Sequence, residues 1–279
     1  MAIVFAALSA LSYGAADFLG GVGTRKSRVY AVLFWSQLTG LLTACIAAPI
    51  AGSLGVSAVD LLWGAAAGLS GAVGIMFLYT ALARTVAAVS SPIAAVVGAI
   101  LPVFVGLSLG ERPEPIAWIG VVLALPAIVL LSREGVGPKA SKKVAQAVRL
   151  GIIAGIGFGA FFVCISRTSS DSGFWPLVAA RTASICAAAL FTLVTRRSLR
   201  LQRESRVPVV ATGFLDMLAN VFYLTASRVG LLILVTVVTA LYPAPTVVLA
   251  RIVHHEHLGL ERIVGLVLAI AGIAFIGLG

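Results

Sequence analysis

Charged residues inside long apolar stretches are the first candidates for chemistry in this chain. Asp17, Arg181 and Asp216 each interrupt such a stretch, and Tyr13 and Asn220 lie one helical turn from the two aspartates. A charge is costly to remove from water, so these side chains are expected to face a cavity or a partner. The carboxylates can bind an amine or carry a proton, and the guanidinium can neutralise one of them or bind a ligand carboxylate.

Polar and aromatic residues in the same kind of stretch extend the candidate set. Gln37 takes roughly the place in its stretch that Arg181 has in its own. Ser91 precedes Pro92, which removes one helical hydrogen bond and frees a carbonyl. The aromatic candidates for the walls of a binding site are Tyr13, Tyr79, Phe158, Tyr223 and Tyr242. The alternative interpretation is structural: polar bridges that lock helices together, and aromatic residues that pack or lie at a membrane interface.

The cluster from His254 to His257 is the only metal-like or enzyme-like feature. It lacks the H-E-x-x-H pattern of zinc proteases. Glu256 in this cluster matches Glu111, which has no histidine beside it. This match favours a shared structural role, such as a carboxylate that caps a helix. No Walker A loop and no Gly-rich dinucleotide motif is present, so we do not expect ATP-driven transport by this chain alone. We expect no catalytic residue, metal or cofactor.

Composition identifies the elements that must position these residues. The chain is 60% hydrophobic and 11% charged, with a mean hydropathy of +1.10. A soluble domain of this size needs more polar residues to cover its surface. Apolar runs long enough to cross a bilayer recur throughout the chain. The predicted fold class is therefore an all-α polytopic membrane protein. The net charge of +10 comes from short basic clusters without aromatic interleaving, which indicates lipid headgroups rather than nucleic acid as the partner.

The apolar runs predict ten transmembrane helices. A polar linker at 132–149, with glycines, a proline and several basic residues, separates a first five-helix repeat at 1–131 from a second at 150–279. The predicted spans are 2–22, 30–50, 59–83, 86–110, 116–131, 150–165, 174–195, 207–227, 231–253 and 263–278. Glycines spaced by four in 151–159 and at Gly64 and Gly68 predict close helix packing.

The two halves resemble each other in residues as well as in length. Tyr13-Gly14-Ala15 matches Phe158-Gly159-Ala160, and Tyr79 with Arg84 matches Tyr223 with Arg228. Each half has an odd number of spans, so the second repeat must be inverted relative to the first. Inverted repeats place binding sites near the bilayer midplane, where the halves meet.

The basic residues predict the orientation in the membrane. All but four of the 20 Lys and Arg residues lie in or beside loops that follow odd-numbered spans; the others are Arg181 within a span and Arg112, Arg167 and Arg228 after even-numbered spans. Positively charged loops stay in the cytoplasm. Both termini are therefore expected outside, in a multi-pass protein of the cell (inner) membrane.

Together these features resemble the drug/metabolite transporter superfamily, EamA type. The resemblance covers nearly the whole chain and rests on the paired five-span halves, the glycine-aromatic motifs, Gly110-Glu111-Arg112, and the Ser91-Pro92-Ile93 and Pro102-Val103-Phe104 runs. It implies a secondary transporter, often an exporter of amino acids or related metabolites. The cavity would be lined by spans one, three, four, six, eight and nine. Members are often described with cytoplasmic termini, which is the reverse of the orientation that the charges predict.

The sequence thus predicts a secondary active transporter that exports a small amphipathic metabolite, such as an amino acid, by alternating access. Protons are a candidate coupling ion, and the internal duplication is compatible with a monomer. Two alternatives stay open: a multidrug exporter of lipophilic cations, and an intramembrane enzyme that modifies a lipid. The first would need an acidic, aromatic cavity without its own cation, and the second would need clustered acid/base or metal residues at one depth.

Overall fold

The computed structural model of the chain describes residues 1–84, 87–132, 141–196, 198–254 and 259–279. Within these ranges the side chains of residues 79, 82–84, 87–88 and 141–142 are not described. Ten helices or helix pairs in the described part are long and apolar enough to cross a membrane. A bilayer offers no water to the backbone, so helices that satisfy their own N–H and C=O groups are the form such sequences take.

The first half contains five helices. They are α1 (Ala2–Lys26), α2 (Val29–Ala51), α3 (Ala58–Arg84), α4 (Ala87–Ser108) and α5 (Pro115–Ser132). The second half adds six helices and two short 3-10 turns. They are α6 (Ser141–Ser166), η1 (Ser170–Ser172), α7 (Trp175–Thr195), η2 (Arg203–Ser205), α8 (Arg206–Val229), α9 (Leu232–Thr239), α10 (Pro243–His254) and α11 (Leu260–Leu278). The all-α class and the ten spans predicted from the sequence are confirmed.

Two boundaries differ from the sequence-based expectation. The helix expected to begin at residue 150 begins at Ser141, inside the predicted linker, because residues 141–149 are mostly good helix formers although too polar for a membrane. The span expected at 231–253 is two helices, α9 and α10, separated at residues 240–242. Pro243 and Pro245 have no N–H to donate, so the α9 ladder cannot continue through them.

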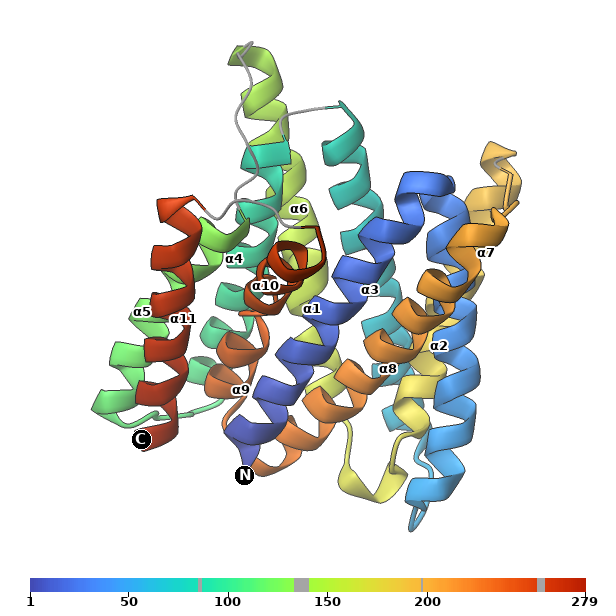
Figure 1. Cartoon of the computed structure of the whole chain (residues 1–279). Coiled ribbons are helices and arrows are strands. Elements are labelled where there is room, and N and C mark those ends of the chain that lie inside the picture. The colour runs from blue at the N-terminus through green and yellow to red at the C-terminus, as the bar shows by residue number, and fades with distance from the viewer. Residues whose placement is uncertain (85–86, 133–140, 197, 255–258) are drawn as a thin grey trace.

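Both chain ends lie at one end of the bundle (Figure 1). We call this end the terminal face; the connections α2–α3 and α6–α7 lie there too. The opposite end, the loop face, carries the α1–α2 connection, the described part of the α7–α8 connection and the C-terminal ends of α3 and α5. Arg25 and Lys26, and the basic residues in the described part of the α7–α8 connection, therefore lie on the face opposite to the termini.

The helices pack in two groups, each drawn from both halves of the sequence. One group contains α3, α4, α6 and α7, and the other contains α1, α2, α8 and α10. Helices α5 and α11 pack against each other, with Gly120 and Gly272 in close backbone contact. The predicted glycine packing is confirmed in the first group. A Cβ on Gly68 would overlap the carbonyl of Ala180 on α7, and a Cβ on Gly155 would lie 2.7 Å from the carbonyl oxygen of Ala94 on α4.

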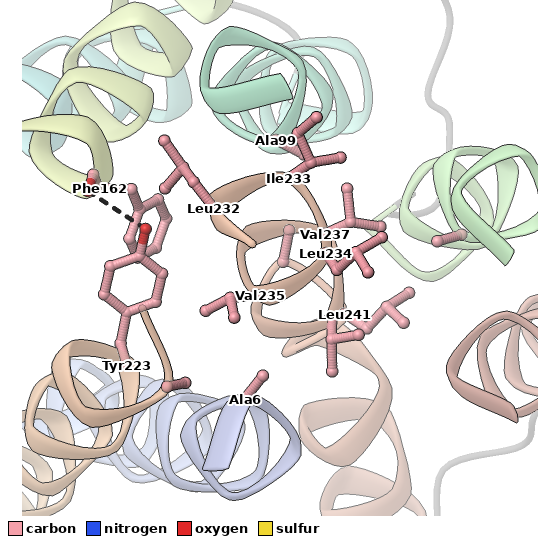
Figure 2. Close-up of a cluster of buried hydrophobic side chains, with 14 of the residues drawn as sticks. Ala6, Ala99, Phe162, Tyr223, Leu232, Ile233, Leu234, Val235, Val237 and Leu241 are labelled. Carbon is pink, nitrogen blue, oxygen red and sulfur yellow. Dashed lines mark hydrogen bonds between the residues drawn. The ribbon is translucent and has the colours of Figure 1, made fainter. Parts of the chain in front are cut away.

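The short helix α9 lies between the two groups. All eight of its residues are buried, and it contacts α4, α1 and α8. Figure 2 shows its side chains surrounded by Ala99, Phe162, Tyr223 and Ala6 from the helices around it. The apolar core is therefore continuous between the groups at this level, on the terminal side of the bundle.

Candidate functional site

A cavity of about 240 Å³ lies between the two helix groups. Seven helices, α1 to α4 and α6 to α8, and the break between α9 and α10 contribute described residues to its wall, whereas α5 and α11 contribute none of them. One side is polar, from α1, α2, α7 and α8, and the other is apolar, from α3, α4 and α6. The side chains on which the argument depends are Tyr13, Asp17, Gln37, Phe158, Arg181, Ser184, Asp216, Asn220 and Tyr242.

Arg181 is the centre of the polar side. Its guanidinium forms an ion pair with the Asp216 carboxylate and donates a hydrogen bond to Gln37 Oε1 at 2.6 Å. Ser184, one turn further along α7, donates to the same Gln37 oxygen at 3.0 Å. The side chain of Arg181 is 10% exposed and that of Asp216 is 28% exposed. The arginine is therefore held in place from α2 and α8, while the carboxylate still faces the cavity.

Asp17 and Asn220 offer unused hydrogen-bonding capacity in the same wall. Asp17 on α1 is exposed to the cavity, and among the described residues no hydrogen bond or ion pair engages its carboxylate. Asn220 donates to the Asp216 backbone carbonyl at 2.6 Å, whereas its buried amide oxygen has no partner in the described part of the chain. A buried acceptor without a partner is costly, which makes the Asn220 oxygen unfavourable as it stands, and the exposed Asp17 carboxylate is suited to a ligand that donates hydrogen bonds.

Aromatic rings close the cavity toward the terminal face. Tyr13 lies 6.2 Å from Tyr242 and 6.4 Å from Phe162, measured between ring centroids. Phe162 in turn lies 4.5 Å from the ring of Tyr223. Phe158 and Phe161 continue this surface along α6. Small residues of α3 and α4, such as Gly71 and Ala95, leave the space that these rings face.

The structure places eight of the eleven predicted site residues in the cavity lining: Tyr13, Asp17, Gln37, Phe158, Arg181, Asp216, Asn220 and Tyr242. Their role in binding a substrate stays a prediction. Ser91 is half-buried on α4 and lies outside the described lining. The side chain of Tyr79, and residues 255–257 of the histidine cluster, lie outside the described residues.

Tyr223 was expected to continue the face of Asp216 and Asn220, but it lies outside the described lining. Its side chain is fully buried, and its hydroxyl donates to the Phe162 carbonyl at 3.2 Å and lies 3.0 Å from Thr236 Oγ1 of α9. The C-terminal part of α8 packs against α6 and α9. The face of α8 that lines the cavity at Asp216 is therefore covered by these two helices at Tyr223, two turns further along.

Sequence reasoning missed Ser184, Phe161, Phe162 and Thr212, which also line the cavity. Helical spacing from the predicted residues would have indicated them. Ser184 follows Arg181 by three positions, Phe161 and Phe162 follow Phe158 by three and four, and Thr212 precedes Asp216 by four. Among the described residues, no group of three or more His, Cys, Asp or Glu side chains could hold a metal ion.

Comparisons with known proteins agree with this architecture. Residues 1–133 and residues 146–278 match the profile of the EamA-like transporter family. A crystal structure superimposes on the chain with a TM-score of 0.80 at 17% sequence identity, covering 99% of this chain and 96% of that one. At that identity the likeness shows the fold alone. No curated protein matches the chain by sequence.

Proposed function

This chain is a member of the EamA-like transporter family, and we propose that it exports a small amphipathic metabolite, with amino acids as the leading class, by alternating access. The family belongs to the drug/metabolite transporter superfamily, as expected from the sequence. Its members are membrane transporters and not enzymes, which removes the lipid-modifying alternative.

The ion pair between Arg181 and Asp216 inside the cavity carries the proposal. A guanidinium binds a carboxylate through two parallel N–H donors. The carboxylates of Asp17 and Asp216 line the space beside it and can accept from an ammonium group. A zwitterion whose carboxylate replaces Asp216 at the guanidinium would therefore find acceptors for its ammonium group on the same wall.

The apolar side of the cavity supports an amphipathic substrate. Phe158 and Phe161 of α6 face small residues of α3 and α4, including Gly71, Ala95 and Gly98. An apolar group transferred there from water gains roughly 25 cal/mol per Å² of surface. The polar wall would fix the orientation of the substrate, and the apolar wall would hold its side chain.

The coupling ion we propose is the proton, with Asp17 as its site. Arg181 and Asp216 neutralise each other, so Asp17 leaves one negative charge in the cavity wall. A charge within the bilayer is costly without a counter-ion. A proton or the ammonium group of the substrate can supply that counter-ion, and the two would compete for one carboxylate.

The test is exchange of radiolabelled amino acids into proteoliposomes preloaded with an unlabelled amino-acid pool. Asp216→Asn and Arg181→Ala are expected to lose exchange, whereas Asp171→Asn, an exposed aspartate on the terminal face, should retain it. Equal elution volumes in gel filtration would show that the variants are folded. Absence of exchange with every amino acid, together with displacement of a bound probe by lipophilic cations, would reject amino acids and favour the multidrug alternative.

A further inference from the structure

We propose that α9 is a mobile plug that closes the cavity on the terminal face, held there by Glu111 and Tyr223. The inference rests on the alternating access proposed above, and it identifies the part of the chain that must move. It does not depend on which substrate the protein carries.

Glu111 binds the first turn of α9, at the terminal face. Its carboxylate accepts hydrogen bonds from the backbone N–H groups of Leu232 at 2.7 Å and Ile233 at 3.0 Å. These N–H groups at the first turn have no partner within the helix, and the helix dipole adds to their attraction for an anion. Glu111 follows α4, which belongs to the other helix group from α8, so this contact links the plug to the group that contains α4.

Tyr223 holds the plug from the side and links it to both groups. From α8, its hydroxyl lies 3.0 Å from Thr236 in the middle of α9 and bonds to the Phe162 carbonyl of α6. Figure 2 shows the Tyr223 ring extending from α8 toward Phe162 of α6, beside Val235 of α9. Both contacts of the Tyr223 hydroxyl are buried, and buried polar groups need hydrogen-bond partners. This hydroxyl keeps its partners only while α6, α8 and α9 stay together.

A third contact closes the surface beside the plug. Arg228, at the end of α8, donates to the backbone carbonyls of Ser169 at 2.8 Å and Gly173 at 2.6 Å in the α6–α7 connection. Asp60 of α3 accepts from the Ser169 and Ser172 hydroxyls of the same connection, at 3.0 and 2.6 Å. The terminal side of the boundary between the helix groups is thus bridged by polar contacts.

The position of the cavity relative to α9 follows from the residues that line it. The α8 residues in the cavity wall, Thr212, Asp216 and Asn220, lie in the part of α8 that begins at the loop face. The α2 residues Leu33 and Gln37 lie within the first three turns of α2, again from that face. Helix α9 runs from the terminal face to the break at 240–242, where Ala240 and Tyr242 line the cavity, so α9 lies between the cavity and the terminal face.

The turn at residues 240–242, whose N–H groups bond to carbonyls of α9, is the hinge of the plug in this proposal and connects it to the site. Helix α9 ends at Thr239, and Pro243 starts α10 without an N–H for the α9 ladder. Ala240 and Tyr242, in the break, are both lining residues of the cavity. A substrate that contacts Tyr242 would therefore act on the hinge of the plug, which makes release of α9 responsive to occupancy.

The experiment measures access to two single cysteines in a background with Cys45, Cys164 and Cys186 replaced by alanine. Val235→Cys reports on the plug, because Val235 is fully buried in α9. Ala72→Cys reports on the cavity wall. A membrane-impermeant maleimide is added to proteoliposomes, and the side reached is identified by protease cleavage of a C-terminal tag. No substrate is needed.

Glu111→Gln and Tyr223→Phe are expected to speed labelling of Val235→Cys from the terminal face roughly tenfold, the effect of losing one strong hydrogen bond. Glu114→Gln, an exposed glutamate three residues from Glu111, is the matched control and should leave labelling unchanged. Labelling of Ala72→Cys from the terminal face should rise as well, because release of the plug opens the cavity to that side. Unchanged protection of Val235→Cys in both variants would overturn the plug, and so would faster labelling of Val235→Cys while Ala72→Cys stays protected, because α9 would then not close the cavity. Faster labelling in a protein that exchanges no amino acid would leave the plug standing and reject only the substrate class.

Discussion

Arg181 of α7 and Asp216 of α8 form an ion pair at the level where the two helix groups meet. The helices belong to different groups but to the same half of the sequence, so the pair crosses a boundary that the sequence repeat does not mark. Gln37 from the first half supports the same guanidinium. The contact therefore stabilises this arrangement of the groups and at the same time occupies the cation that a substrate carboxylate would need.

Removing one partner of this pair should destabilise the protein more than removing both. Arg181→Ala would leave Asp216 without a counter-charge in a largely buried position, at a cost of about 3 kcal/mol. The double variant Arg181→Ala with Asp216→Asn removes the uncompensated charge and should recover part of the loss. Thermal unfolding in detergent measures both. Strictly additive losses in the double-mutant cycle would contradict coupling between the two residues.

The contact between α3 and α7 predicts a strong effect of one methyl group. A Cβ on Gly64 would overlap the backbone carbonyl of Pro176 on α7, so Gly64→Ala must push the helices apart, at about 1–3 kcal/mol. Gly21→Ala on α1 is the matched control, because no atom lies within 4 Å of the added carbon. The measurement is the melting temperature of each variant in the same detergent. Equal melting temperatures would show that the helices can separate without cost.

Much of this fold could be predicted from the sequence, because bilayer thickness imposes a length on each apolar run. The break between α9 and α10 could not be predicted from length alone, since residues 231–253 are apolar throughout and long enough for one span. Pro243 and Pro245 were visible signals, yet prolines also occur inside α2, α4 and α5 without ending those helices. Whether a proline bends or ends a helix depends on neighbours that the sequence does not show.

The candidate site divides in the same way. Charges in apolar runs indicated Asp17, Arg181 and Asp216 because the cost of burying a charge is a local property. Which carboxylate pairs with Arg181 depends on how α7, α8 and α1 pack, and the sequence left both open. Tyr223 shows the opposite case. Its spacing from Asn220 placed it on the correct face of α8, but that face leaves the cavity and packs on α6 and α9.

The arrangement of basic residues predicts the orientation of the chain in the membrane. Arg25–Lys26 and the connection that contains Arg196, Arg200 and Arg203 lie on the loop face, opposite to both termini. Basic loops remain in the cytoplasm, so a C-terminal alkaline phosphatase fusion should be active and a C-terminal green fluorescent protein fusion should be dark. The reverse pair of results would place the termini in the cytoplasm.

Asp17 should be dispensable for stability but required for coupling. No described residue forms a hydrogen bond or ion pair with its carboxylate, so Asp17→Asn removes an uncompensated charge and should leave the melting temperature unchanged or raise it. Arg181 and Asp216 remain in place, so exchange of substrate for substrate should continue, with a lower substrate affinity because the ammonium group loses one of its acceptors. Accumulation driven by a pH gradient should disappear, because an amide cannot carry a proton. The measurement compares exchange with gradient-driven transport in the same proteoliposomes, with Asp171→Asn as the control. Gradient-driven accumulation that persists in Asp17→Asn would show that another group carries the coupling ion, with Asp216 as the remaining carboxylate in the described cavity wall.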